Sequence, residues 1–341
     1  YNFNSPSSTV QDCVFSHNVT ANGSTMYNSV TSSPVVKNTI FVGNSGNGTL
    51  VNTTMSSPLI KDCIFCGNRV LFGGGVYNSL ASPTIQNTIF VGNYASAGGG
   101  GMYNVNSNTF PLVQNCVFIS NTASNWGGGI YNWILVNVAL TNCVLWGNSS
   151  AFGNEMRNSQ TCMSVMTCCN IKGGWNGSGL AIDVTSTNLD GGGNIDADPL
   201  FVIGTNGTWT QDATYSPSAF QSLLIDTNSF WSTNAFKGAF IRPDTNCVFQ
   251  YLIVSNDSTS LAIWGDFSTN QLIGKSYQIY DYHLQKLSPC IDAGTNIVSV
   301  TNDLDGIARP LDGNWDGTAA WDIGTYEFVY QKPRGTVIKI Q

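Results

Sequence analysis

Apolar and polar positions recur along the first half of the chain as a fixed phrase rather than with the period of a helix. The phrase is an apolar residue, any residue, Asn or Asp, Cys or Thr, any residue, Phe, any two residues and Asn, with Leu replacing Phe in the sixth copy. The copies lie at residues 10–18, 36–44, 60–68, 85–93, 113–121 and 140–148, with a degenerate seventh at 165–173. The six regular copies start 24 to 28 residues apart. Such a period indicates a solenoid, in which each unit buries its apolar face by stacking on its neighbours.

The residue types of the copies distinguish a β solenoid from a helical one. The copies are rich in Val, Ile, Phe, Thr, Asn and Gly, which favour strands and turns, whereas helical repeats need Ala, Leu, Glu and Lys. Runs of three to five strand-forming residues, broken by Asn or Gly, fit coils of three short strands. The sequence therefore predicts an all-β fold, a right-handed parallel β-helix of about seven coils whose strands lie about 4.8 Å apart along the axis.

Equivalent positions of the copies should form columns along such a β-helix. Two apolar columns are expected inside it: Val36, Ile60, Ile85, Val113 and Leu140, and Phe41, Phe65, Phe90 and Phe118. Two asparagine columns are expected at corners, where Asn tolerates left-handed geometry and its amide bonds the amides above and below. Their members are Asn18, Asn44, Asn68, Asn93, Asn121 and Asn148, and Asn28, Asn52, Asn78, Asn104, Asn132 and Asn158.

Tyrosine and cysteine columns raise the question of function. Tyr27, Tyr77, Tyr103 and Tyr131 share a position that Val51 interrupts. We interpret this column as an aromatic stack that stabilises one face, with stacking of a sugar on it as the alternative. Cysteine recurs at another position, in the set Cys13, Cys63, Cys116, Cys143 and Cys168. Stacked side chains point the same way, which is poor disulfide geometry, so we predict that the last three are reduced and buried.

The repeat also indicates how the chain is organised. Residues 1–15 align with residues 27–41, so the chain begins inside a coil and we expect it to be a fragment of a longer protein. The predicted units are β-helix coils at 1–175, a last coil and connection at 176–204, a small antiparallel β module at 205–281 and an Asp-rich cap at 282–341.

Composition narrows the classes of partner. Only 10% of the residues are charged, against about a quarter in ordinary globular proteins, and the net charge is −7. This balance disfavours a nucleic acid partner. No stretch approaches the roughly 20 apolar residues of a membrane-spanning helix, so we expect no membrane-spanning segment in this chain.

The inventory of ionisable residues argues against catalysis. Inverting polysaccharide hydrolases need one carboxyl group as acid and another to activate water. Residues 1–180 contain three carboxylates, Asp12, Asp62 and Glu155, and no two of them belong to adjacent coils of the alignment. We therefore predict that the protein has no catalytic activity of its own.

The pairing of Phe-x-x-Asn with Gly-Gly-Gly-apolar resembles the repeats of polymorphic outer-membrane proteins, the β-helical surface adhesins of chlamydiae and related bacteria. Phe-x-x-Asn begins at Phe15, Phe41, Phe65, Phe90 and Phe118, and the glycine element stands at 73–76, 98–102 and 127–130. The stretches 191–202, 281–296 and 303–328 are similar to the tail of many secreted bacterial β-helix proteins. These resemblances imply an extracellular or cell-surface bacterial protein.

Acidic residues gather in the C-terminal part. Residues 312–317, DGNWDG, match the opening of an EF-hand calcium loop, although Ile323 stands where that loop has its bidentate Glu. We expect a structural Ca²⁺ that pins 303–328 against the last coil; the alternative is an Asx-rich surface turn. The candidate ligands are Asp303, Asp305, Asp312, Asn314, Asp316 and Asp322.

Two functions remain open on this sequence. The first is an extracellular or cell-surface structural, adhesin-like protein that contacts a host or neighbouring cell, glycans, or other copies of itself by end-to-end stacking. The alternative is a carbohydrate-active β-helix, as a polysaccharide-binding module, a lyase or a glycoside hydrolase. A groove lined by aromatic residues with at least two charged side chains favours the alternative. A flat face of Asn, Thr and Ser favours the first.

Overall fold

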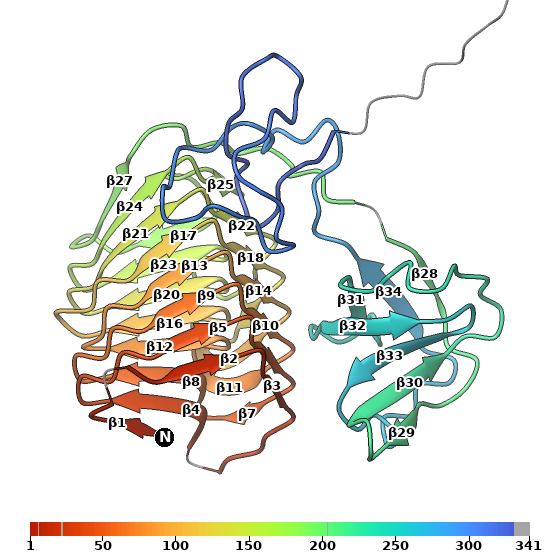
Figure 1. Cartoon of the computed structure of the whole chain (residues 1–341). Helices are drawn as coiled ribbons and strands as arrows, with labels where there is room; N and C mark the ends of the chain where they lie inside the picture. Colours follow the sequence, from red (N-terminus) through yellow and green to blue (C-terminus); the bar gives the residue numbers. More distant parts are fainter. Residues whose placement is uncertain (6, 22, 203, 331–341) are drawn as a thin grey trace, which may run out of the picture.

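The computed structural model describes residues 1–5, 7–21, 23–202 and 204–330. Every regular element among them is a β-strand. The chain first winds through about seven turns of a parallel solenoid, whose strands stack into four parallel sheets (Figure 1). A seven-stranded antiparallel sheet and a C-terminal segment follow. The predicted all-β fold, a parallel β-helix with an antiparallel insert, is confirmed.

Successive strands of a turn enter sheets 1, 2 and 3, and in the middle turns also sheet 4. Sheet 1 contains β1 (Asn2–Phe3), β4 (Ser24–Ser29), β8 (Gly48–Thr53), β12 (Val76–Ser79), β16 (Met102–Val105), β20 (Ile130–Trp133), β23 (Met156–Ser159) and β26 (Leu180–Ile182). Sheet 2 contains β2 (Thr9–Gln11), β5 (Val35–Lys37), β9 (Leu59–Lys61), β13 (Thr84–Gln86), β17 (Leu112–Gln114), β21 (Asn137–Thr141), β24 (Met163–Thr167) and β27 (Thr187–Asp190). Sheet 3 contains β3 (Val14–Ser16), β6 (Ile40–Val42), β10 (Ile64–Cys66), β14 (Ile89–Val91), β18 (Val117–Ile119), β22 (Val144–Trp146) and β25 (Asn170–Ile171). Sheet 4 contains β7 (Ser45–Gly46), β11 (Arg69–Phe72), β15 (Tyr94–Gly98) and β19 (Thr122–Ala123).

Both predicted apolar columns lie inside the solenoid. The aliphatic column from Val36 to Leu140 pairs in register along sheet 2, and each member is buried. The four phenylalanines from Phe41 to Phe118 form a fully buried stack, with successive ring centroids 4.4–5.0 Å apart. This spacing equals the distance between stacked strands, so each ring packs on the next without a void.

Two asparagine ladders run along the axis. In the first, from Asn18 to Asn148, each Nδ2 donates to the Oδ1 of the next residue at 2.8–3.0 Å. In the second, from Asn28 to Asn158, the same contacts measure 2.7–2.9 Å. The prediction that both ladders stand at corners is wrong for the second. Its members lie within the strands of sheet 1, where alternation turns their side chains to the interior.

Other residues make the bends. Asp12, Asn38, Asp62, Asn87, Asn115 and Asn142, between sheets 2 and 3, have φ between 46° and 55°. Asn and Asp tolerate this left-handed geometry better than most residues. The first ladder instead follows a left-handed position, which is Gly43, Gly67 and Gly92 in successive turns.

The cysteine column is confirmed with a shift at its end. All ten cysteines are free thiols, and Cys63, Cys116 and Cys143 are fully buried. Cys168 is not in the column. Thr167 pairs with Thr141, so Cys169 aligns with Cys143 and is buried, while Cys168 takes the left-handed bend position and is half-exposed. The degenerate seventh copy therefore starts one residue later than predicted.

Sheet 3 is buried on both faces. Its five middle strands are apolar at every position, as in "IFV" at 40–42 and 89–91, which is typical of strands covered on both sides. Outward-facing Val42, Cys66 and Val91 join a second core that includes Leu252 of the antiparallel sheet and Ile323 of the C-terminal segment. The two later parts of the chain thus cover this sheet along its length.

The antiparallel sheet has its own core and an irregular order. Its strands, from one edge to the other, are β28 (Asn206–Thr208), β34 (Ser276–Tyr280), β31 (Phe240–Arg242), β32 (Tyr251–Asn256), β33 (Ser260–Trp264), β30 (Gln221–Ile225) and β29 (Thr214–Ser216). Trp209 and Tyr277 stack in its core with centroids 4.1 Å apart. Tyr251 bridges to the first coil, where His17 stacks on it at 6.2 Å.

The C-terminal segment runs along the side of the solenoid. Asn142 donates to Thr295 O at 2.7 Å and accepts from Thr295 N at 2.8 Å, and its own carbonyl accepts from Gly324 N. Asn87, two coils earlier, donates to the Asn302 carbonyl. The sequence placed 303–328 against the last coil, whereas Gly324 contacts Asn142 of the sixth copy, because the segment packs on the apolar outer face of sheet 3.

Candidate functional site

Sheet 1 presents the tyrosine column on its outer face. Strand pairing sets Tyr27, Val51, Tyr77, Tyr103, Tyr131 and Arg157 in one line across neighbouring strands. Tyr1 extends the line, with its ring stacked on that of Tyr27 at 5.1 Å. The column therefore has seven members, six of them in strands, and runs from the exposed ring of Tyr1 to the cation of Arg157.

A second column forms a wall beside the first. Phe72, Gly98, Trp126 and Phe152 occupy equivalent positions in successive turns. The Phe72 ring stacks on Tyr103 at 4.9 Å, and Trp126 lies 5.7 Å from Tyr131. Gly98 is needed here, since a Cβ atom at this position would lie 2.6 Å from the Tyr131 ring. We call the two columns together the aromatic groove.

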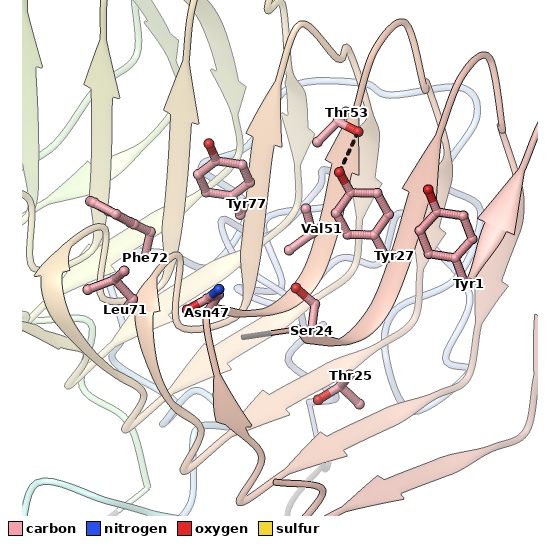
Figure 2. A pocket seen from close by; sticks show the side chains of 11 residues that line it. Tyr1, Ser24, Thr25, Tyr27, Asn47, Val51, Thr53, Leu71, Phe72 and Tyr77 are labelled. Atoms are coloured by element: carbon pink, nitrogen blue, oxygen red, sulfur yellow. Dashed lines mark hydrogen bonds between the residues drawn. The ribbon is translucent and has the colours of Figure 1, made fainter. Parts of the chain in front are cut away.

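The larger hollow of the groove lies at the interruption of the tyrosine column. Figure 2 shows Tyr1, Tyr27 and Tyr77 standing on the same face, with the smaller Val51 between the last two. The missing ring leaves a cavity of about 650 Å³, walled by Leu71 and Phe72. Tyr27 and Tyr77 are two strand spacings apart, roughly 10 Å. A ring placed midway would lie about 5 Å from each, within the usual range of stacking distances.

Polar groups line this hollow at its rim. Thr53 Oγ1 donates to the Tyr27 hydroxyl oxygen at 3.2 Å, and Ser24 and Asn47 also line the cavity. No charged side chain is among its lining residues within the described chain. The hollow thus combines aromatic faces with neutral hydroxyl and amide groups.

The middle of the column is closed. Tyr103 and Tyr131 are buried beneath Phe72 and Trp126, and their rings stack at 5.2 Å. Burial raises the pKa of both phenols above the ordinary value. This part of the column acts as the structural aromatic stack that the sequence predicts.

A second hollow, of about 410 Å³, opens at the other end of the groove. Trp126, Tyr131 and Trp133 line it together with Arg157 and Asp183. Trp126 is 37% exposed, so the hollow offers an accessible aromatic edge. Among the described residues, Arg157 and Asp183 are the charged side chains that line the two hollows of the groove.

Asp183 is ionised and anchored. Desolvation by burial raises its pKa, but hydrogen bonds outweigh this and lower the pKa to about 2. The donors are Gln160 N at 2.5 Å and both the backbone N and Oγ1 of Thr185 at 3.1 and 2.8 Å. A carboxylate held in this way stays charged and does not donate a proton at neutral pH.

The predicted calcium ligands are not gathered at one site. Asp312, Asn314 and Asp316 share one exposed loop, in which Asp312 accepts hydrogen bonds from Asp316 N and Gly317 N at 3.1 Å. The other three predicted ligands have different partners, as follows. Asp303 accepts from Glu327 N, Asp305 contacts His283, and Asp322 accepts from Asp292 N. No group of three His, Cys, Asp or Glu in the described residues is arranged to hold a metal ion. Calcium binding stays a prediction, restricted by this geometry to the 312–317 loop.

Comparison with known proteins gives no assignment. No family model matches the sequence, and neither curated proteins nor solved structures include a significant match. The described residues also contain no helix long and apolar enough to span a bilayer. The aromatic groove is therefore interpreted from its own geometry.

The sequence predicts the tyrosine column of the groove but not the second column, which runs from Phe72 to Phe152. The tyrosine column was visible because it recurs in the repeat, as was its interruption at Val51. Phe72, Trp126 and Phe152 were missed because turn lengths differ between copies and Gly98 breaks the aromatic pattern. Arg157 was missed because it ends the column with a different residue type. Aligning the copies on Asn78, Asn104, Asn132 and Asn158 would have revealed it, since Arg157 immediately precedes the last of these.

Proposed function

We propose that this protein is an extracellular or cell-surface, non-catalytic β-helix that binds carbohydrate chains along the aromatic groove. The observation that carries the proposal is the interruption of the tyrosine column at Val51, where Tyr27 and Tyr77 line a hollow of about 650 Å³. The groove also meets the criterion set from the sequence, because it is lined by aromatic rings and contains two charged side chains, Arg157 and Asp183. A flat Asn, Thr and Ser face would have favoured a purely structural role.

The chemistry of the groove suits a sugar better than an apolar ligand. A pyranose ring has apolar faces that pack on aromatic rings and hydroxyl groups around its edge. The hollow supplies aromatic faces from two tyrosines and neutral polar groups such as Thr53 at the rim. Its volume of about 650 Å³ lies within the range of small-molecule sites. The linear arrangement of hollows along one sheet fits a chain rather than a single small molecule.

Binding without hydrolysis is supported by the ionisable groups. A glycoside hydrolase uses two carboxyl groups, one of them protonated at working pH. One carboxylate, Asp183, lines the described groove, and its low pKa keeps it charged. The resemblance to β-helical surface adhesins and secreted β-helix proteins supports a bacterial surface or extracellular location, where glycans of a host or neighbouring cell are the expected partners.

The test is glycan-array binding combined with a reducing-end assay on the bound polysaccharides. We expect binding without release of new reducing ends. Tyr77→Ala should weaken binding roughly tenfold, because it removes one wall of the ring-sized gap. Phe230→Ala is the matched control, since Phe230 is 92% exposed outside the groove. Loss of binding in both variants alike, or no binding by the unmodified protein, would refute the proposal.

A further inference from the structure

Arg157 is placed where the tyrosine column would continue. Strand β23 pairs with β20 so that Arg157 lies beside Tyr131, as Tyr131 lies beside Tyr103. Its guanidinium carbon stands 5.7 Å from the centre of the Phe152 ring, whose edge is exposed at the groove wall. The cation therefore takes the position of the next ring in the column and lines the second hollow.

The guanidinium has no counterion among the described residues. No carboxylate of the described chain lies within 4.0 Å of it, and Arg157 Nε is buried without a hydrogen-bond partner. Asp183, in the same hollow, is bound by the backbone and side-chain donors of Gln160 and Thr185 instead. A guanidinium that contacts an aromatic ring but no carboxylate can form charge-assisted hydrogen bonds with an incoming anion through its terminal nitrogens.

Arg157 and the gap at Val51 lie on the same face of sheet 1, at a distance that one carbohydrate chain can span. Arg157 lies four strands from Val51 along sheet 1, roughly 19 Å at the spacing of parallel strands. A carbohydrate chain that fills the first hollow and passes over Phe72 and Trp126, which close the middle of the column, reaches the second hollow within a few sugar units. The groove therefore offers a neutral aromatic subsite at one end and a cationic subsite at the other.

We propose that Arg157 binds an anionic substituent, a carboxylate or a sulfate, on the carbohydrate chain, so that the ligand is an acidic glycan. This inference rests on the function proposed above. Planar guanidinium forms paired hydrogen bonds with either group, which gives selectivity over a neutral sugar of the same shape. The neighbouring Asp183 sets the boundary of the subsite, because its fixed negative charge repels a second anion there.

The experiment compares two pairs of oligosaccharides, each with an acidic and a neutral member of the same sugar backbone. Oligogalacturonate with its methyl ester, and an oligosaccharide of neutral sugars with and without sulfate groups, are titrated against the protein and against Arg157→Gln. We expect the unmodified protein to prefer the acidic ligands, with affinity that falls as salt is raised. Arg157→Gln should lower the affinity for the acidic ligands on the order of tenfold to a hundredfold and lower that for the neutral ligands far less. The acidic ligand that gains more affinity over its own neutral counterpart identifies the substituent.

Two further variants keep the result interpretable. Arg69→Gln removes the same charge outside the groove, where Arg69 stacks on Tyr94 of sheet 4, and should bind as the unmodified protein does. Arg157→Lys keeps the charge but not the paired hydrogen bonds. Its affinity for the acidic ligands should lie between those of the unmodified protein and Arg157→Gln. Equal affinity for acidic and neutral chains, unaffected by Arg157→Gln, would overturn this inference and leave glycan binding intact. Failure to bind any of the chains would overturn both.

Discussion

Glu155 ends the first asparagine ladder. It is buried, and Asn148 Nδ2 donates to its Oε2 at 2.5 Å. Burial raises the pKa of Glu155 to about 7, although the hydrogen bonds from Asn148 and the charge of Lys172 lower it. The folded state therefore keeps a proton that the unfolded chain releases above pH 4.5. Stability falls as the pH rises from about 4.5 to 7, and the loss is complete above that range.

Replacing the Glu155 carboxyl by an amide should remove the part of the pH dependence of stability that Glu155 causes. Glu155→Gln keeps an acceptor for Asn148 but cannot ionise. We expect the variant to be more stable than the unmodified protein above pH 7, by on the order of 2–3 kcal/mol, and equally stable near pH 4. Denaturant unfolding of both proteins from pH 4 to 8 measures this difference. A difference independent of pH would show that Glu155 is not buried as described.

Within a strand, the repeat of the sequence predicts which side chains face the interior, because neighbouring side chains alternate between the two faces. The inward columns of sheet 2 and the phenylalanine stack were predictable, because their positions recur in every copy. The apolar runs of sheet 3 contained the signal that both faces are covered, but not what covers them. The groove wall was not predictable from the phrase, since it depends on where turns of unequal length return to the sheet.

Filling the gap in the tyrosine column should separate stability from binding. In Val51→Tyr the new ring would stack between Tyr27 and Tyr77 at the spacing of the column. Each new aromatic pair adds about 0.5–1.5 kcal/mol, so the melting temperature should rise. The same ring occupies the ligand position, and glycan affinity should fall at least roughly tenfold.

The control for this change is Val51→Ile, which keeps an aliphatic side chain and leaves the gap open. Calorimetry and a binding titration on the three proteins give both readouts. If Val51→Tyr binds glycan as well as Val51→Ile does, the ligand does not enter the gap.

At the scale of the whole molecule, the later parts of the chain brace the solenoid from the side. The C-terminal segment has its own buried centre, where Arg309 Nη1 lies 3.0 Å from Glu327 Oε1 and both side chains are inaccessible. Arg309 also donates to the carbonyls of Asp322 and Gly324, next to the contact with Asn142. No local pattern predicts the hydrogen bonds between Asn142 and Thr295, because the two residues lie 153 positions apart in sequence.

Calcium should act on one loop of this segment rather than on its core. Asp312, Asn314 and Asp316 alternate in an exposed loop, and their carboxyl and amide oxygens are the type of ligand that Ca²⁺ takes. We expect a chelator to lower the melting temperature and to admit protease at 312–317, while the coils before residue 150 stay protected. Mass spectrometry of the limited digest locates the cuts. An unchanged melting temperature and digest would identify the segment as an acidic turn.

The most direct test of glycan binding in the groove is a crystal structure of the protein with an acidic oligosaccharide bound. We predict a sugar ring above Val51, between the rings of Tyr27 and Tyr77, with the chain continuing toward Arg157. Density for the sugar on the antiparallel sheet or on another face of the solenoid, with the gap unfilled, would contradict the account.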